Sequence, residues 1–154
     1  MRATPWLAAL LLVFGLGATA RGAPVGGAIE GDWWTEDREA IARIYEEDGV
    51  FFGKLIWTEE TGAKDDDNPD PKLRDRPLKG LVFLKGFRFD GDGEWDGGKV
   101  YAPDDGKTYS GYMKLGGPDT LKLRGYVGFR LFGRTATWKR VAPDAYPDGI
   151  VPAE

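Results

Sequence analysis

From Gly31 onward, apolar and polar positions alternate along the chain instead of recurring at the spacing of a helix. The clearest run spans 120–131. One face of this run would carry Leu121, Leu123, Gly125, Val127, Phe129 and Leu131, and the other Lys122, Arg124, Tyr126, Gly128 and Arg130. We predict eight strands, over 31–35, 39–46, 50–58, 80–89, 94–101, 107–115, 120–131 and 133–141.

Short turn sequences separate the predicted strands. Asp48-Gly49 is typical of a tight hairpin, and Asp104-Asp105-Gly106 of a type I turn with glycine in the left-handed position. Neighbouring strands joined by hairpins favour an all-β fold, a single up-and-down antiparallel barrel of eight strands that leaves no bare edge. An open two-sheet sandwich is the alternative.

Residues 59–79 interrupt this rhythm with aspartates and three prolines, which exclude a central strand. We therefore predict a long loop between strands three and four, and a loop of this length in a compact domain is commonly functional or disordered. In an up-and-down barrel, strand one starts and strand eight ends at the same rim. Trp33 should then lie near Trp138 and Arg140 at one end, with the loop over the opposite mouth.

The first residues predict an exported protein. Arg2, an apolar stretch over 6–17 and Ala18-Thr19-Ala20 together resemble a secretory signal cleaved after Ala20. A membrane anchor is the alternative, although the apolar stretch is short for a spanning helix. We expect a periplasmic or secreted protein without a transmembrane segment after cleavage. We divide the chain into a signal peptide (1–20), a linker (21–30), a barrel (31–141) and an extended tail (142–154).

Composition narrows the chemistry. The chain has 154 residues, which predicts one domain, and a formal net charge of −4, which argues against a nucleic-acid partner. It contains no His and no Cys, so disulfides, thiol nucleophiles and Ser-His-Asp catalysis are excluded. We expect no cofactor, no resident metal and no catalysis. A glycoside hydrolase built on two carboxylates is the one enzyme hypothesis left, and no pair of carboxylates stands out for it.

Aromatic side chains on the predicted strands are candidates for lining a cavity. The interior of an eight-stranded barrel is just wide enough to be filled by side chains or to hold one small ligand. The candidates for binding a small, partly apolar ligand are Phe52, Trp57, Phe83, Tyr101, Tyr109 and Tyr126. The alternative is that these rings simply fill the core.

The long loop supplies polar candidates at the mouth: Asp67, Asn68, Asp70, Arg74 and Arg76. Oxygen-rich loops can bind calcium, but a solvated turn closed by its own hydrogen bonds explains the same residues. The two guanidinium groups suit a carboxylate or phosphate ligand. Alternatively they pair with Asp67, Asp70 or Asp75 and hold the loop against the rim.

Gly31-Asp32-Trp33 resembles the G-x-W signature of lipocalin and calycin barrels. In those families the Trp plugs the closed end and an Arg near the last strand packs across it, roles that Trp33 and Arg140 match by position. The resemblance therefore implies a structural closed end made of Gly31, Trp33, Trp138 and Arg140.

Longer stretches, over 68–81, 97–111 and 124–138, resemble a family of secreted bacterial proteins catalogued as domain of unknown function 2147. The resemblance implies a lipocalin-like barrel in the periplasm or beyond, with a small-ligand role. Members often carry Cys where this chain has Lys79, so no thiol activity is carried over. The leading hypothesis is thus non-catalytic binding of a small ligand. The alternative is a filled barrel that docks another protein or a cell-wall polymer.

Overall fold

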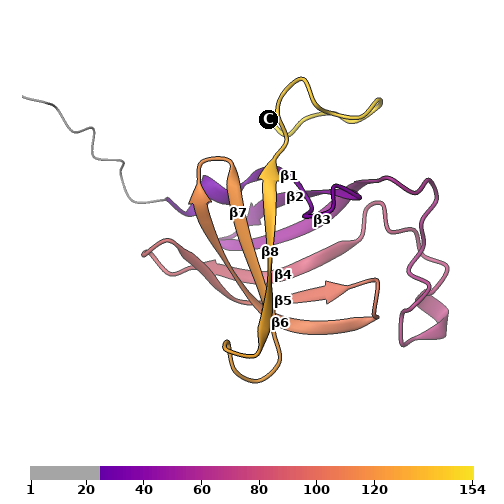
Figure 1. Ribbon diagram of the computed structural model, residues 1–154, viewed down its shortest axis with the longest axis horizontal. Helices are drawn as coiled ribbons and strands as arrows, with labels where there is room; N and C mark the ends of the chain where they lie inside the picture. The colour runs from indigo at the N-terminus through magenta and orange to yellow at the C-terminus, as the bar shows by residue number, and fades with distance from the viewer. Residues whose placement is uncertain (1–24) are drawn as a thin grey trace, which may run out of the picture.

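Eight antiparallel strands pair in sequence order, and β8 pairs with β1 to close a barrel (Figure 1). This confirms the predicted up-and-down architecture. The computed structural model describes residues 25–154, so the predicted signal peptide lies outside the described residues. The strands are β1 Gly31–Trp34, β2 Ala40–Glu47, β3 Val50–Thr58, β4 Val82–Phe89, β5 Glu94–Ala102, β6 Lys107–Gly117, β7 Thr120–Tyr126 and β8 Gly133–Arg140.

The connections alternate between the two ends of the barrel. The turns at 48–49, 90–93 and 118–119 share one end with the start of β1 and the end of β8. The connections 35–39, 59–81, 103–106 and 127–132 share the other. Figure 1 shows the long β3–β4 connection projecting beside the end of the β5–β6 hairpin. Among residues 25–154, no helix is long and apolar enough to cross a membrane.

The seventh strand is shorter than predicted. It ends at Tyr126, and the side chains of Val127, Phe129 and Leu131 are 68%, 76% and 79% exposed instead of facing the barrel interior. Gly128 takes a positive φ of 72°, a left-handed conformation that breaks the extended backbone. Alternation of apolar side chains alone therefore overestimated this strand by five residues.

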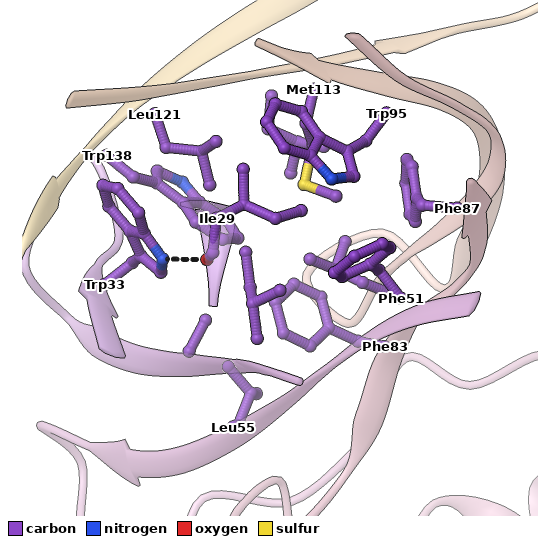
Figure 2. Packing of buried hydrophobic residues seen from close by; sticks show 14 residues of the cluster. Ile29, Trp33, Phe51, Leu55, Phe83, Phe87, Trp95, Met113, Leu121 and Trp138 are labelled. Atoms are coloured by element: carbon purple, nitrogen blue, oxygen red, sulfur yellow. Dashed lines mark hydrogen bonds between the residues drawn. The ribbon is translucent and has the colours of Figure 1, made fainter. Parts of the chain in front are cut away.

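A short 3-10 helix, η1 (Gly26–Ile29), plugs the end of the barrel where β1 starts, although 21–30 was expected to be a linker. Ile29 is fully buried at the centre of the cluster in Figure 2. Two indoles from the barrel wall donate to this turn: Trp33 Nε1 to the Ile29 carbonyl at 2.9 Å, and Trp95 Nε1 to the Gly26 carbonyl at 2.8 Å. The plug is thus held by hydrogen bonds as well as by packing.

Arg140, at the end of β8, completes this closed end. Its guanidinium carbon lies 4.1 Å from the centre of the Trp33 ring, and its nitrogens donate to the carbonyls of Ala28, Glu30 and Pro118 at 2.8–3.0 Å. Gly31 has a φ of 116°, and a Cβ there would lie 2.9 Å from Arg140 Nη1. Only glycine therefore fits both the backbone conformation and the space beside the guanidinium.

The closed half of the barrel is filled. Its interior positions carry large buried side chains, and Figure 2 shows them packed around Ile29. Phe51 and Phe89 pack against Trp95 with ring centres 6.4 and 4.8 Å away. The residues with less than 2% exposure here include Trp33, Ile44, Leu84, Phe87, Trp95, Met113 and Leu121.

The C-terminal segment after β8 folds back onto the outer face of β1 and β2. Its anchor is Asp32, whose side chain is fully buried and accepts two hydrogen bonds of 2.7 Å from Arg43. The same carboxylate accepts from the Tyr146 hydroxyl at 2.9 Å and from the Ala153 amide at 3.1 Å. The expected extended tail is therefore a fastened strap on the barrel wall.

Replacing Arg140 by Lys should lower the free energy of unfolding by about 2 kcal/mol, because one ammonium cannot reproduce the planar fork that serves three backbone carbonyls and covers the Trp33 ring. Urea unfolding followed by tryptophan fluorescence measures the change. The matched control is Arg134→Lys, whose side chain is 82% exposed and which should cost less than about 0.5 kcal/mol. Equal losses in both variants would contradict the role given to Arg140.

The strap should respond to alkaline pH. Burial and the hydrogen bond to Asp32 raise the pKa of Tyr146 from 10.0 to about 12. A raised pKa means that the neutral phenol stabilises the fold below pH 10 and that this contribution is lost as the pH rises through 12. The difference in unfolding free energy between wild type and Tyr146→Phe should shrink over that interval.

Tyr112→Phe is the control for this measurement, since the Tyr112 hydroxyl forms no hydrogen bond within residues 25–154. At neutral pH it should cost less stability than Tyr146→Phe, because no hydrogen bond of the hydroxyl is lost. A Tyr146→Phe difference that does not change as the pH rises from 10 to 12 would show that the phenol does not hold the strap.

Candidate ligand-binding site

A cavity of about 1080 Å³ occupies the half of the barrel opposite η1 and opens at the rim. Its volume is comparable to that of pockets that hold small organic molecules. Strand residues form its walls, and the connections 35–39, 59–81, 103–106 and 127–132 contribute the residues around its mouth. The barrel is therefore filled at one end and hollow at the other.

The floor of the cavity is apolar. Phe83 and Trp138 lie side by side with ring centres 6.0 Å apart, and both belong to the buried core as well as to the cavity lining. Leu55 and Leu123 likewise belong both to the buried core and to the cavity lining. Trp138, expected at the closed end, thus separates the filled half from the hollow half, with Trp33 and Arg140 below it.

Four of the six aromatic candidates line the cavity: Phe83, Tyr101, Tyr109 and Tyr126. Tyr101 and Tyr109 lie toward the rim, where their hydroxyls donate to Asp65 and Asp105, whereas the Tyr126 ring packs against Tyr112 at 6.4 Å. Tyr109 donates to the Asp105 carboxylate, and that bond lowers the pKa of Asp105 and raises the pKa of Tyr109. The wall of the cavity therefore changes from apolar at the floor to hydrogen-bonding at the mouth.

Phe52 and Trp57 lie on the outer face of the barrel, so the prediction that they line the cavity is wrong. Phe52 stacks on Tyr45 at 5.8 Å, one position away from the inward-facing Phe51. Trp57 would follow Leu55 inward, but β3 contains a bulge: Ala42 pairs with Leu55 while Ile41 pairs with Trp57. The extra residue turns Trp57 outward, where it packs edge-on against Trp34 at 5.6 Å.

The long β3–β4 connection is fastened to the barrel by Asp65, whose side chain is fully buried. Asp65 accepts from Arg76 Nε at 2.7 Å, from Asn68 Nδ2 at 2.7 Å and from the Tyr101 hydroxyl at 2.6 Å. Burial alone would raise the pKa of this carboxyl, but the hydrogen bonds from Tyr101, Asn68 and Arg76 outweigh it and bring the pKa below its usual value. Asp65 is therefore a charged anchor inside the loop.

The other polar candidates of the loop mainly organise its backbone. Arg74 Nε donates to the Asn68 carbonyl at 2.8 Å, and Asn68 Oδ1 accepts from the Asp70 amide at 2.9 Å. Asp70 in turn caps η2 (Pro71–Leu73) by accepting from the Lys72 amide. The expected pairing of the arginines with Asp67, Asp70 or Asp75 is wrong for both, since Arg76 pairs with Asp65 and Arg74 with a carbonyl.

The tip of the β5–β6 hairpin fits closely against this loop. Gly106 has a φ of 66°, and a Cβ there would lie 2.0 Å from the Asp67 carbonyl oxygen. The turn glycine is therefore needed for the contact as well as for the turn itself. Asp67, which makes this contact, and its neighbour Asp66 both belong to the cavity lining.

The mouth of the cavity is strongly acidic. Two cations line it, Lys64 and Arg134, against nine carboxylates, an excess of seven negative charges. We call these carboxylates the acidic rim: Glu36, Asp37, Glu39, Glu59, Glu60, Asp66, Asp67, Asp104 and Asp105. Among residues 25–154, no group of three potential ligands is arranged to hold a metal ion.

The two most consequential polar residues, Asp32 and Asp65, were not selected from the sequence. Asp65 is one of three successive aspartates, and the periodicity of the chain does not distinguish it from Asp66 or Asp67. Asp32 is the middle residue of G-x-W and alternates with Trp33. This alternation predicts that the Asp32 side chain lies on the outside of the barrel, but it does not predict that the C-terminal strap covers it. Each of these two aspartates has a tyrosine and an arginine within hydrogen-bond distance, and only the three-dimensional structure reveals these partners.

Comparison with known proteins agrees with this architecture. Residues 31–140 match a family described as an uncharacterised protein conserved in bacteria, DUF2147. The chain belongs to that family. No curated protein matches this DUF2147 member. Among solved structures it is similar to the protein HP1028 from the human pathogen Helicobacter pylori, which is described as belonging to the lipocalin family.

The likeness to that lipocalin covers most of both molecules. The two share 30% sequence identity over 75% of this DUF2147 chain and 84% of the other, with a TM-score of 0.68. The lipocalin-like barrel implied by G-x-W is thus confirmed, and so is the family that the longer stretches resemble.

Replacing Asp65 by Asn should lower the free energy of unfolding by about 3 kcal/mol near neutral pH, because it leaves the Arg76 guanidinium without its buried partner. A lowered pKa stabilises the fold above the ordinary carboxyl pKa of 3.8, and this contribution is lost as the pH falls through the folded value. The difference from wild type should therefore shrink in acid.

Asp66→Asn is the neighbouring control, because that side chain is exposed and forms no salt bridge within residues 25–154. Denaturant unfolding near neutral pH and in acid compares the two variants. Equal effects of the two substitutions, or a difference for Asp65→Asn that does not change with pH, would contradict the anchoring role.

Proposed function

We propose that this barrel is a non-catalytic carrier or sensor of a small, partly apolar molecule, bound in the hollow half of the barrel. The observation that carries the proposal is the cavity of about 1080 Å³ above the Phe83–Trp138 floor. A barrel that was only a rigid scaffold would gain stability by filling this volume, since empty apolar space forfeits packing contacts. Here the large side chains are concentrated at the closed end instead.

The lining supports a ligand with an apolar body. Leu55, Phe83, Leu123 and Trp138 offer apolar contacts at the bottom, and Tyr101 and Tyr109 above them add hydroxyls and aromatic rings. Pockets that hold organic ligands combine such walls with a few polar groups that fix orientation. The lipocalin-like relative shares this architecture.

The absence of catalysis is part of the proposal. A hydrolase with two carboxylates needs one acid whose pKa is raised, so that it can donate a proton. The surroundings lower the pKa of the carboxyls of Asp65, Asp90, Glu94 and Asp105. These groups are stabilised as anions, which suits anchoring and electrostatic attraction.

We also propose that the protein works outside the cytoplasm. The support is the sequence pattern of residues 1–20, with its positive start, short apolar stretch and small residues before Ala20. Amino-terminal sequencing of the mature protein from its native cell envelope tests this. A start at Arg21 is expected, and an intact Met1 in that fraction would contradict cleavage.

Filling the cavity tests the binding function directly. Ala136 lines the cavity from β8, and Ala136→Phe should weaken binding of the neutral fluorescent probe N-phenylnaphthylamine by about tenfold, since the added ring occupies the probe's volume. The probe's fluorescence rises in apolar surroundings, so a titration gives the dissociation constant.

Thr137→Phe adds the same ring at the next position of β8, which does not line the cavity. This control should bind the probe as the wild type does. No probe binding to the wild type, or equal weakening by both substitutions, would contradict a binding site inside the barrel.

A second candidate function, docking to another envelope protein, is favoured by the β7–β8 connection. Arg124 donates to the carbonyls of Arg130 and Leu131, and Arg130 pairs with Glu94 and stacks on Tyr112 at 4.2 Å. The connection is thus held in place while Phe129 and Leu131 remain exposed. The double variant Phe129→Ser with Leu131→Ser should abolish such docking and leave probe binding unchanged. Loss of both docking and probe binding would instead indicate that the connection forms part of the cavity.

A further inference from the structure

The charge of the molecule is concentrated at the mouth of the cavity. The lining carries nine carboxylates and two cations, a net charge of −7, whereas the whole chain has a net charge of −4. Outside the lining, residues 25–154 carry 17 Lys and Arg against 16 Asp and Glu, a net charge of +1. An uneven distribution of this size gives the open end a negative potential that the closed end does not share.

Most of this charge is not neutralised internally. The two cations at the mouth are already engaged: Lys64 Nζ lies 3.1 Å from Asp75 Oδ1, and Arg134 Nη2 lies 3.0 Å from Glu36 Oε2. Asp105 accepts hydrogen bonds from the Tyr109 hydroxyl and the Lys107 amide. The other seven members of the acidic rim form no salt bridge within residues 25–154.

The carboxylates surround the opening instead of meeting at one point. They come from three connections that the topology places at the same end of the barrel: 35–39, 59–67 and 104–105. Carboxylates around an opening with apolar walls focus the electrostatic field into it. Such a ring attracts a cation that enters the opening, and it repels an anion of the same shape.

The cavity beneath the acidic rim determines the chemistry of the rest of the cationic ligand. Below the rim the lining becomes apolar, down to Phe83 and Trp138. A molecule that fills the site from floor to mouth therefore needs an apolar body at one end and a positive charge at the other. Tyr109, between the two regions, presents a ring face that also favours an organic cation.

We propose that the ligands of this cavity are cationic amphiphiles, with an alkyl or aromatic body on the Phe83–Trp138 floor and an amine or quaternary ammonium group within the acidic rim. This inference rests on the proposed binding function and adds the chemical class of the ligand. The attraction acts between exposed charges, so it weakens as salt screens it.

The test compares three ligands that share a decyl chain and differ in head group: decyltrimethylammonium, decanol and decanoate. Each displaces N-phenylnaphthylamine, which is neutral, from the wild-type protein. At low ionic strength the cation should bind about tenfold more tightly than the anion, with the alcohol between them, and about 0.5 M salt should remove most of this difference.

Variants locate the effect on the rim. Glu59→Gln with Glu60→Gln removes two rim carboxylates and should reduce the preference for the cation about threefold, without changing affinity for decanol. The matched control, Glu47→Gln with Asp92→Asn, removes two carboxylates at the closed end, one from the last residue of β2 and one from the β4–β5 turn, and should leave the preference unchanged.

The outcomes separate the two proposals. If the probe and all three decyl compounds fail to bind, the proposed binding function itself is wrong. If all three bind equally, or decanoate binds best, the cavity is a binding site and the inference about charge is wrong. If both pairs of substitutions change the preference equally, net charge and not the acidic rim determines it, which also overturns the inference.

Discussion

The structure depends on the contact between Arg140 and the turn that plugs the barrel. One guanidinium covers the Trp33 ring and donates to the carbonyls of Ala28 and Glu30, which have no partner within the 3-10 turn. The indoles of Trp33 and Trp95 serve two more carbonyls of the same turn. The indoles of Trp33 and Trp95 are thus committed to the closed end, which is filled, whereas the opposite end is hollow.

The two segments that lie outside the barrel strands are fastened by the same chemistry. Asp32 is buried among Arg43, Tyr146 and the Ala153 amide, and it holds the C-terminal strap. Asp65 is buried among Arg76, Tyr101 and Asn68, and it holds the β3–β4 connection. A buried carboxylate with several donors fixes one geometry, because any displacement leaves a charge without partners. We infer that both segments are fixed parts of the fold.

Alternation and turn residues were sufficient to predict the barrel, and G-x-W with Arg140 was sufficient to predict its closed end. The errors have local causes. The bulge in β3 reversed Trp57 without changing the sequence pattern, and Gly128 ended β7 inside an uninterrupted alternation. The anchoring role of Asp65 could not be predicted, since its partner Tyr101 lies 36 residues away in the sequence. Patterns of period two assign faces, but they do not reveal contacts between distant segments.

The two ends of the barrel differ in charge as well as in packing. Fixing the β3–β4 connection through Asp65 places Asp66 and Asp67 at the mouth, and the close fit of Gly106 beneath Asp67 brings Asp104 and Asp105 to the same side. Like charges held together in this way repel one another, so their arrangement reduces stability unless something positive binds. Within residues 25–154, the two cations at the mouth, Lys64 and Arg134, are already paired with carboxylates, so a bound cation of the proposed class would supply that positive charge. The anchor that orders the loop therefore also creates the electrostatic demand that a ligand can satisfy.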